Sequence, residues 1–236
     1  YGFYVGKEIK EVSLLQESAS LSARVKDGLV QLEGLRDSFV ENLSFKITDI
    51  EGWSYTTKAY RFLIDSKDPY LKVLSPVDGL WVQDSVDLEV EADDDNGIQS
   101  LSYSLDLGNT WIHMPEQEYS VNLRNIPDGS IGMAIRAVDR AGRETIQSFS
   151  INKDTKAPEA DFIVPVAGSR INGENTVGIH VLDEGKILSI HYISPEGDRI
   201  PLEPSHFLTL TIGTEEMPLE NEMAFEFIDA SGNVTV

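Results

Sequence analysis

The sequence predicts an all-β chain of tandem β-sandwiches, and three observations support this fold class. First, apolar and polar residues alternate along short segments such as residues 86–90 and 133–137. A period of two is typical of a strand that buries one face. Second, turn-forming residues recur about every 8–12 positions, as they do between the strands of a sandwich. Third, no segment shows the long 3.6-residue period of an amphipathic helix.

An internal repeat sets the size of the predicted sandwiches. An Asp-x-x-Gly pattern follows an apolar segment at Asp49, Asp139 and Asp229, which stand 90 residues apart. The segment Asp-Ser-Lys-Asp-Pro at 65–69 returns 89 residues later as Asp-Thr-Lys-Ala-Pro at 154–158. Markers that keep one register indicate a structural repeat. A repeat of about 90 residues has the size of an immunoglobulin-type sandwich.

The repeat predicts three domains, of which the outer two are incomplete. By its register, Tyr1 aligns with Val90 and Val236 aligns with Ile146. Because open sandwich edges are normally covered, we expect a longer array or terminal strands that pair with other chains. Short linkers that contain proline make an extended and fairly stiff array the expected arrangement. The predicted domains are a partial sandwich at 1–66, a sandwich at 67–155, and a sandwich at 156–236 that lacks most of its last strand.

The composition restricts the class of partner. The net charge is −21, from 40 acidic and 19 basic residues, so the surface repels nucleic acid and anionic membranes and attracts cations. No cysteine is present to form a disulfide, and no apolar run approaches the roughly 18 residues of a membrane span. The expected partners are therefore a protein or glycan ligand and neighbouring domains, without nucleic acid and without a direct membrane span.

Two segments resemble parts of bacterial immunoglobulin-like and fibronectin-III-like tandem repeats of surface or secreted proteins. Residues 154–158 are similar to the linker that opens many such repeats, and residues 126–143 are similar to their last hairpin. Residues 229–233 end in the same way. The resemblance implies this fold for residues 67–236, and more weakly for 1–66, together with a location outside the bacterial cell or on its surface. It implies little about function, because such modules occur in many kinds of protein.

Residues 104–111 match the pattern S-x-D-x-G-x-T-W, which resembles the Asp box of sialidases and related propellers. In those proteins the motif is a structural hairpin away from the catalytic site. Asp and Gly suit the tight turn, and Trp packs beneath it. We expect it to join two neighbouring strands of the second repeat rather than to bind sugar through Trp111.

Acidic loops form the strongest candidate for a ligand site. In an immunoglobulin-type sandwich, the linker that precedes the first strand, one inter-strand loop and the last hairpin share one pole. Their carboxylates would supply oxygen ligands of the kind that Ca²⁺ takes, although the spacing of an EF-hand is absent. The alternative is that each Asp only bonds its own turn and faces water. The candidate calcium ligands are Asp65, Asp68, Asp93, Asp94, Asp95 and Asp139 in one repeat, and Asp154, Asp183, Glu184 and Asp229 in the next.

The sequence contains no recognisable catalytic motif and predicts a chain that is not an enzyme. The zinc-protease pattern H-E-x-x-H, the serine-hydrolase pattern G-x-S-x-G and a phosphate-binding loop are all missing. The favoured hypothesis is a stalk or an adhesion and binding module of a larger bacterial surface protein. One alternative is an accessory region of a large secreted polysaccharidase or protease with its catalytic domain elsewhere. Another is a component of an envelope assembly.

Overall fold

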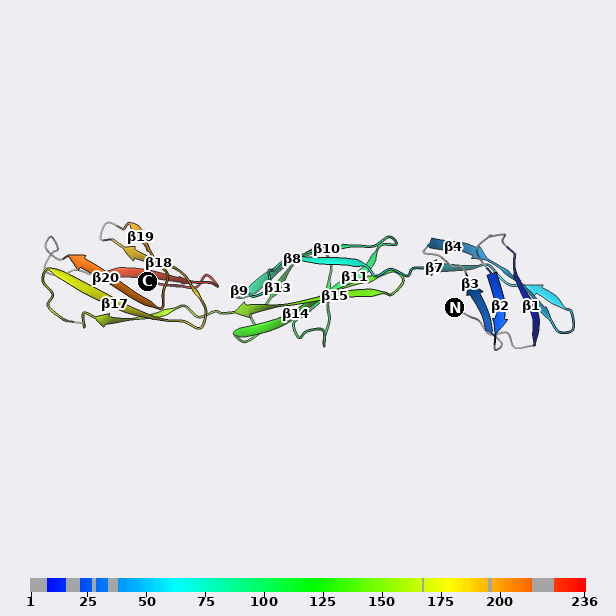
Figure 1. The fold of residues 1–236 in the computed structure, drawn as a ribbon, viewed down its shortest axis with the longest axis horizontal. Helices are drawn as coiled ribbons and strands as arrows, with labels where there is room; N and C mark the ends of the chain where they lie inside the picture. Colours follow the sequence, from blue (N-terminus) through cyan, green and yellow to red (C-terminus); the bar gives the residue numbers. More distant parts are fainter. Residues whose placement is uncertain are drawn as a thin grey trace. The chain divides into compact units, whose positions relative to one another are not determined.

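The structure, a computed structural model, describes residues 8–15, 22–26, 29–33, 38–166, 168–194, 197–213 and 223–236. Every regular element within these ranges is a β-strand, and the strands are numbered β1 to β22 (Figure 1). The predicted all-β fold class is thus confirmed. No described residue belongs to a helix of the length and apolarity needed to cross a lipid bilayer.

The first seven strands form three small sheets around a common apolar core. Strand β5 lies between β1 and β6, while β2 pairs with β3 and β4 with β7. Val12, Val30, Leu43, Phe45 and Ile47 are buried together in this core. The strands are β1 (Ile9–Leu14), β2 (Ser22–Lys26), β3 (Leu29–Glu33), β4 (Ser38–Leu43), β5 (Phe45–Asp49), β6 (Ser54–Thr56) and β7 (Tyr60–Ile64).

The next eight strands form a three-stranded and a five-stranded sheet. Their orders are β13-β10-β8 and β12-β11-β14-β15-β9, with β9 parallel to β15. Along β10, buried Val86, Leu88, Val90 and Ala92 alternate with exposed residues, as the period of two predicts. The strands are β8 (Tyr70–Ser75), β9 (Leu80–Val82), β10 (Ser85–Asp93), β11 (Ile98–Ser104), β12 (Ile112–Met114), β13 (Glu118–Asn122), β14 (Gly129–Asp139) and β15 (Glu144–Lys153).

The last seven strands repeat this sheet order, except that no described strand occupies the place of β9. They form the sheets β16-β17-β20 and β19-β18-β21-β22, whose core includes Val177, Ile179, Ile190, Phe225 and Phe227. The last strand, β22, has two residues where β15 has ten. The strands are β16 (Glu159–Val164), β17 (Glu174–Leu182), β18 (Ile187–Ile193), β19 (Arg199–Leu202), β20 (Phe207–Gly213), β21 (Ala224–Asp229) and β22 (Val234–Thr235).

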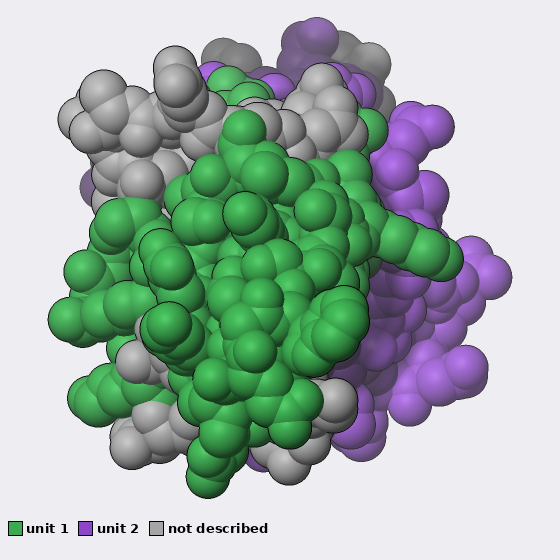
Figure 2. Space-filling model, turned by 90° about the vertical axis from the view of Figure 1, so that its right-hand side faces the viewer, with its two compact units in different colours: residues 1–70, 93–99, 137–145 green, residues 71–92, 100–136, 146–236 purple. Residues whose placement is uncertain are grey.

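The chain divides into two compact units, which do not coincide with the predicted domains (Figure 2). Every described sheet takes all of its strands from one of three groups, β1–β7, β8–β15 or β16–β22. This grouping does not test the predicted borders at 66/67 and 155/156, which stay a prediction. The first unit comprises Tyr1–Tyr70, Asp93–Gln99 and Ala137–Thr145, and the second comprises Leu71–Ala92, Ser100–Arg136 and Ile146–Val236.

The repeated Asp-x-x-Gly pattern forms the same turn three times. The backbone N–H of Asp49, Asp139 and Asp229 donates to the carbonyl four residues later, at 3.0, 3.0 and 3.2 Å. The Gly three residues after each Asp has a φ of 90°, 87° and 87°, in the left-handed region that favours glycine. This requirement explains why Gly returns with Asp at an interval of 90 residues.

The Asp-box motif is the predicted hairpin. Strands β11 and β12 pair antiparallel on either side of it. Asp106 accepts hydrogen bonds from the Ser104 hydroxyl at 2.6 Å and from the Thr110 backbone N–H at 2.8 Å, and these bonds hold the pKa of its carboxyl below the usual range. The guanidinium carbon of Arg136 lies 4.4 Å from the centre of the Trp111 ring. Trp111 thus takes part in packing within the sandwich.

Candidate metal centre

The structure brings six of the ten candidate carboxylates together in two groups of three. Within each group, one carboxylate oxygen of every residue lies within 4.8 Å of the corresponding oxygens of the other two. We call Asp65, Asp94 and Asp139 the first cluster, and Asp154, Asp183 and Asp229 the second cluster. Each cluster lies within one compact unit.

The members of the two clusters come from equivalent elements. Asp65 and Asp154 follow the last strand of one repeat, in the linkers after β7 and β15. Asp94 directly follows β10, and Asp183 directly follows β17. Asp139 and Asp229 end β14 and β21 at the repeated Asp-x-x-Gly turn. The loops and the linker of one sandwich pole therefore meet at each cluster.

In the first cluster, one oxygen of every carboxylate bonds to its own loop. The Oδ1 atom of Asp65 accepts from the backbone N–H of Lys67 at 3.1 Å, and that of Asp94 accepts from Asn96 at 2.8 Å. The Oδ1 atom of Asp139 accepts from the N–H groups of residues 141 and 143, at 2.7 and 2.9 Å. These bonds are ordinary Asx-turn contacts, and they fix the orientation of all three side chains.

The Oδ2 atoms of the first cluster differ in their hydrogen bonding. The Oδ2 atom of Asp65 accepts from the side-chain amide of Asn96 at 2.8 Å. Asp139 is fully buried, at 0% exposure, and its Oδ2 atom has no hydrogen-bond partner among the described residues. Buried carboxylate oxygens without a partner are rare, because they lose hydration without compensation.

The second cluster repeats the pattern of loop bonds. The Oδ1 atom of Asp154 accepts from the N–H of Lys156 at 3.0 Å, that of Asp183 from Gly185 at 2.5 Å, and that of Asp229 from Asn233 at 2.9 Å. Asp154 and Asp229 are 5% and 0% exposed. The Oδ2 atom of Asp183 is buried and has no hydrogen-bond partner among the described residues.

Burial and like charge disfavour the ionised form of Asp183. Burial raises the pKa of its carboxyl, and the neighbouring carboxylates Asp229 and Asp154 raise it further, against a lowering by the Gly185 N–H bond. The Asn233 side-chain amide donates to Asp229 Oδ2 at 2.8 Å and to the Asp154 carbonyl at 3.1 Å. The second cluster is thus a buried concentration of negative charge with one supporting amide.

The other four candidate ligands lie outside the clusters. Asp68 pairs with Arg143 at 2.7 Å, Asp95 pairs with Lys67, and Glu184 pairs with Lys156 at 3.5 Å. Asp93 is an exposed residue at the end of β10. A basic side chain thus neutralises three of the four.

Sequence reasoning missed the two supporting amides and one close approach. Asn96 and Asn233 lie next to candidate carboxylates in the sequence, but which oxygen each one bonds depends on the folded loops. A side chain at Gly185 would lie 3.4 Å from Asp154 Oδ2, 3.3 Å from Asp183 Oδ1 and 3.2 Å from the Trp81 ring. Glycine therefore allows this close approach, because a Cβ atom at this position would be crowded by both carboxylates and the Trp81 ring.

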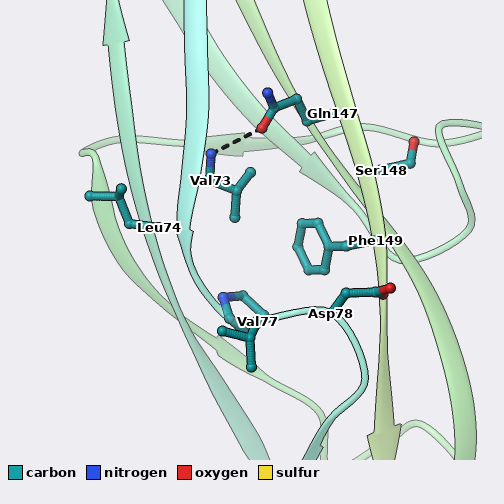
Figure 3. Close-up of a pocket in the computed structure, with 8 residues that line it drawn as sticks. Val73, Leu74, Val77, Asp78, Gln147, Ser148 and Phe149 are labelled. Atoms are coloured by element: carbon teal, nitrogen blue, oxygen red, sulfur yellow. Dashed lines mark hydrogen bonds between the residues drawn. The ribbon is translucent and has the colours of Figure 1, made fainter.

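A separate shallow hollow between β8 and β15 contains neither cluster (Figure 3). It has a volume of about 410 Å³ and is bordered by Val73, Val77, Asp78, Gln147 and Phe149, among others. Gln147 accepts from the Val73 N–H at 3.0 Å, as Figure 3 shows, and Asp78 accepts from the Ser150 N–H at 2.7 Å. The polar groups of this hollow therefore join β15 to β8 and its adjoining turn.

Comparison with known proteins shows similarity of fold only. No protein-family model and no curated protein matches the chain. The fibronectin(III)-like modules of CbhA from Clostridium thermocellum are 13% identical over 71% of this chain and 90% of theirs, with a TM-score of 0.46. The FN1–FN3 domains of chicken CNTN1 are 11% identical over 87% of this chain and 75% of theirs, with a TM-score of 0.36.

A third similar structure is the complex of Dpr2 Ig1–Ig2 with DIP-Theta Ig1–Ig3. It is 10% identical over 94% of this chain and 80% of its own, with a TM-score of 0.37. These structures are of fibronectin-III-like and immunoglobulin-like domains. At such identities and scores they identify no ligand and no activity, so the function must be argued from this chain's own residues.

Proposed function

We propose that this chain is a non-catalytic spacer, the stalk or adhesion segment of a larger bacterial surface protein that lies outside the cell. The observation that carries the proposal is that both linkers are bonded along their length to the surrounding loops. A linker held in this way keeps a set geometry, whereas a free linker samples many. A spacer of fixed geometry is the function that this arrangement serves best.

The linker at 65–69 is bonded along its length to residues of the loops. Asp65 and Asp68 bond Asn96 and Arg143, and Lys67 pairs with Asp95. Its last residue, buried Pro69, accepts from the Thr145 hydroxyl at 2.6 Å. Because each bond restricts a different residue, the whole segment loses conformational freedom.

The linker at 154–158 is bonded in the same manner. The Asp154 N–H donates to the Val82 carbonyl at 2.9 Å, and the Thr155 hydroxyl donates to Asp128 at 2.8 Å. Buried Pro158 accepts from the Thr235 hydroxyl at 2.5 Å, as Pro69 does from Thr145. The repetition of this threonine–proline bond at an interval of 89 to 90 residues supports a role for both linkers in fixing the geometry.

Distance measurements between spin labels test the proposal. The chain has no cysteine, so Glu33→Cys and Glu203→Cys would place one label in β3 and one beyond β19 without competing sites. We expect a single narrow distance distribution. Replacing Pro158 by Gly and Thr235 by Ala should broaden it, because both changes release the second linker.

A control pair at Asp87→Cys and Asn109→Cys, both between β8 and β15 in the sequence, should give the same distribution with and without the linker changes. A broad distribution of distances between the labels at positions 33 and 203, measured with both linkers unaltered, would contradict the spacer function. It would favour a flexible tether instead.

A further inference from the structure

We infer that each carboxylate cluster is a calcium site, so that the chain binds two ions. This inference goes beyond the spacer function and stands or falls independently of it. Its starting point is that a role in turn formation accounts for only half of the oxygens. All six carboxylates use Oδ1 for a backbone N–H of their own loop. The Oδ2 atoms need a separate explanation.

Two of the six Oδ2 atoms are buried and accept no hydrogen bond from the described residues. One belongs to Asp139 in the first cluster, and the other to Asp183 in the second. A turn residue that faces water would leave such an oxygen hydrated. Asp139 is instead completely buried, and the Oδ2 atom of Asp183 is buried as well. Water therefore does not account for these two oxygens.

Basic side chains do not account for them either. Those nearest in the sequence to the clusters pair with other carboxylates: Lys67 with Asp95, Arg143 with Asp68 and Lys156 with Glu184. These three ion pairs lie outside the clusters, and at the second cluster the charge of His206 lowers the pKa of Asp183 less than burial raises it. Burying ionised groups in this way is unfavourable unless a cation joins them.

The close approach of the oxygen donors is most evident in the second cluster. Gly185 has no side chain at the point where one would meet both Asp154 Oδ2 and Asp183 Oδ1 within 3.4 Å. Asn233 bonds the Asp229 carboxylate and the Asp154 carbonyl, and so fixes two walls of the cluster. The cluster thus holds its oxygen donors in fixed positions close to one another, as a preorganised cation site requires.

The chemistry of the donors favours calcium over other metals. Zinc prefers sulfur and nitrogen ligands, but the chain has no cysteine and neither cluster contains histidine. Magnesium demands a near-ideal octahedron and retains its water. Calcium accepts six to eight oxygens in a flexible arrangement, and carboxylates are its usual protein ligands. Three carboxylates would supply part of this shell, and carbonyl groups or water would supply the remainder.

Counting bound ions tests the inference directly. The full chain, freed of metal with EDTA, would be titrated with calcium chloride up to about 10 mM, since extracellular calcium modules dissociate at about 10⁻⁴ to 10⁻³ M. We expect two ions per chain. Asp139→Asn and Asp183→Asn should each bind one ion, and the double variant should bind none in this range.

Matched controls separate the clusters from general acidity. Asp68→Asn and Glu184→Gln remove a charge beside each cluster but no cluster ligand, so both variants should still bind two ions. Magnesium should bind at least tenfold more weakly than calcium. Circular dichroism and the Tm in EDTA should show each variant folded, because Asn keeps the oxygen that accepts the turn N–H bonds. If Asp139→Asn nonetheless unfolds, Asp94→Asn replaces it as the variant for the first cluster.

Three results would overturn the inference. The first is no calcium bound to the unaltered chain at 10 mM, the limit of the titration set above. The second is two ions retained by folded Asp139→Asn and Asp183→Asn. The third is equal binding of magnesium, which would overturn the assignment to calcium.

Discussion

In the first cluster the supporting amide is Asn96, which bonds the linker carboxylate Asp65. In the second it is Asn233, which bonds the turn carboxylate Asp229. The buried oxygen without a partner changes as well, from Asp139 to Asp183. The three carboxylate positions are therefore the constant part of the repeat, and the hydrogen bonds around them vary.

This difference separates two explanations of the acidic loops. If the carboxylates served only their turns, nothing would require three of them to remain grouped when the neighbouring amides change. A shared cation requires that grouping and tolerates different supports, because outer contacts need only orient the ligands. The comparison of the clusters thus favours the cation site, and each of the following predictions would break or sharpen it.

The largest expected effect concerns an ion pair beside the second cluster. Lys153 is buried, with 4% of its side chain exposed, and its ammonium group lies 2.8 Å from Asp128 Oδ1. Asp128→Asn would leave this charge without its close partner, and should lower the free energy of unfolding at pH 7 by about 3–5 kcal/mol. Urea unfolding in EDTA would measure the loss.

The pH dependence of this loss gives a second check. The hydrogen bond from Lys153 lowers the pKa of the Asp128 carboxyl, with help from Thr155 and against the effect of burial. A lowered pKa contributes stability above the ordinary carboxyl range, and that stability disappears as the pH falls through the lowered value. The difference from Asp128→Asn should therefore shrink in acid. Asp84→Asn, which removes an exposed carboxylate 3.9 Å from Lys153, should cost less than about 1 kcal/mol. A small loss for Asp128→Asn at pH 7 would contradict the role of this pair.

Calcium should stabilise the chain by an amount that depends on which cluster is intact. Each occupied site should add about 2.7 kcal/mol at a hundredfold excess over its Kd. Thermal unfolding with calcium and with EDTA would show this gain. Asp139→Asn should lose the part that belongs to the first cluster, and Asp183→Asn the part that belongs to the second. Equal gains in both variants and the unaltered chain would contradict the assignment.

The side-chain amides of Asn96 and Asn233 should each affect calcium binding at one cluster only. Asn96→Ala removes the bond to Asp65 and should cost about 0.5–1.5 kcal/mol in EDTA, with weaker calcium binding at the first cluster. Asn233→Ala should have the same effect at the second cluster. Calorimetric titration of each variant would resolve one weakened and one unchanged site. Weakening of both sites by one substitution would refute separate supports.

The smallest expected effect is a gain in thermal stability on substitution, where the other substitutions cause a loss. Because the pKa of Asp183 is raised, its ionised form destabilises the folded chain at neutral pH. Asp183→Asn should therefore raise the Tm slightly in EDTA while it abolishes calcium binding at the second cluster. The gain should vanish as the pH falls through the raised pKa, where Asp183 itself becomes neutral. A lower Tm of Asp183→Asn in EDTA at neutral pH would contradict this account.

Local features of the fold were predictable from the sequence, and long-range ones were not. The alternation along β10 and the glycine of the Asp139 turn follow from the chain within a few residues of each position. The parallel pairing of β9 with β15 depends on residues some 70 positions apart, and no local pattern indicates it. Local sequence patterns thus predict strands and turns, whereas the pairing of strand edges depends on residues far apart in the sequence.

The candidate site shows the same limit. Asp65 and Asp68 lie in the same linker, yet only Asp65 joins a cluster, while Arg143 pairs with Asp68 from 75 residues away. In the same way, Lys67 pairs with Asp95 but leaves Asp94 in the first cluster. The sequence could indicate an acidic pole, but the choice of ligands depends on where the basic side chains reach.

The most direct measurement is anomalous diffraction from crystals of the full chain soaked with terbium, which substitutes for calcium and scatters strongly. The account predicts two strong peaks, one in contact with oxygens of Asp65, Asp94 and Asp139, and one in contact with oxygens of Asp154, Asp183 and Asp229. Peaks at Asp68, Asp95 or Glu184 with none at the clusters would contradict it. The six grouped carboxylates would then be turn residues alone.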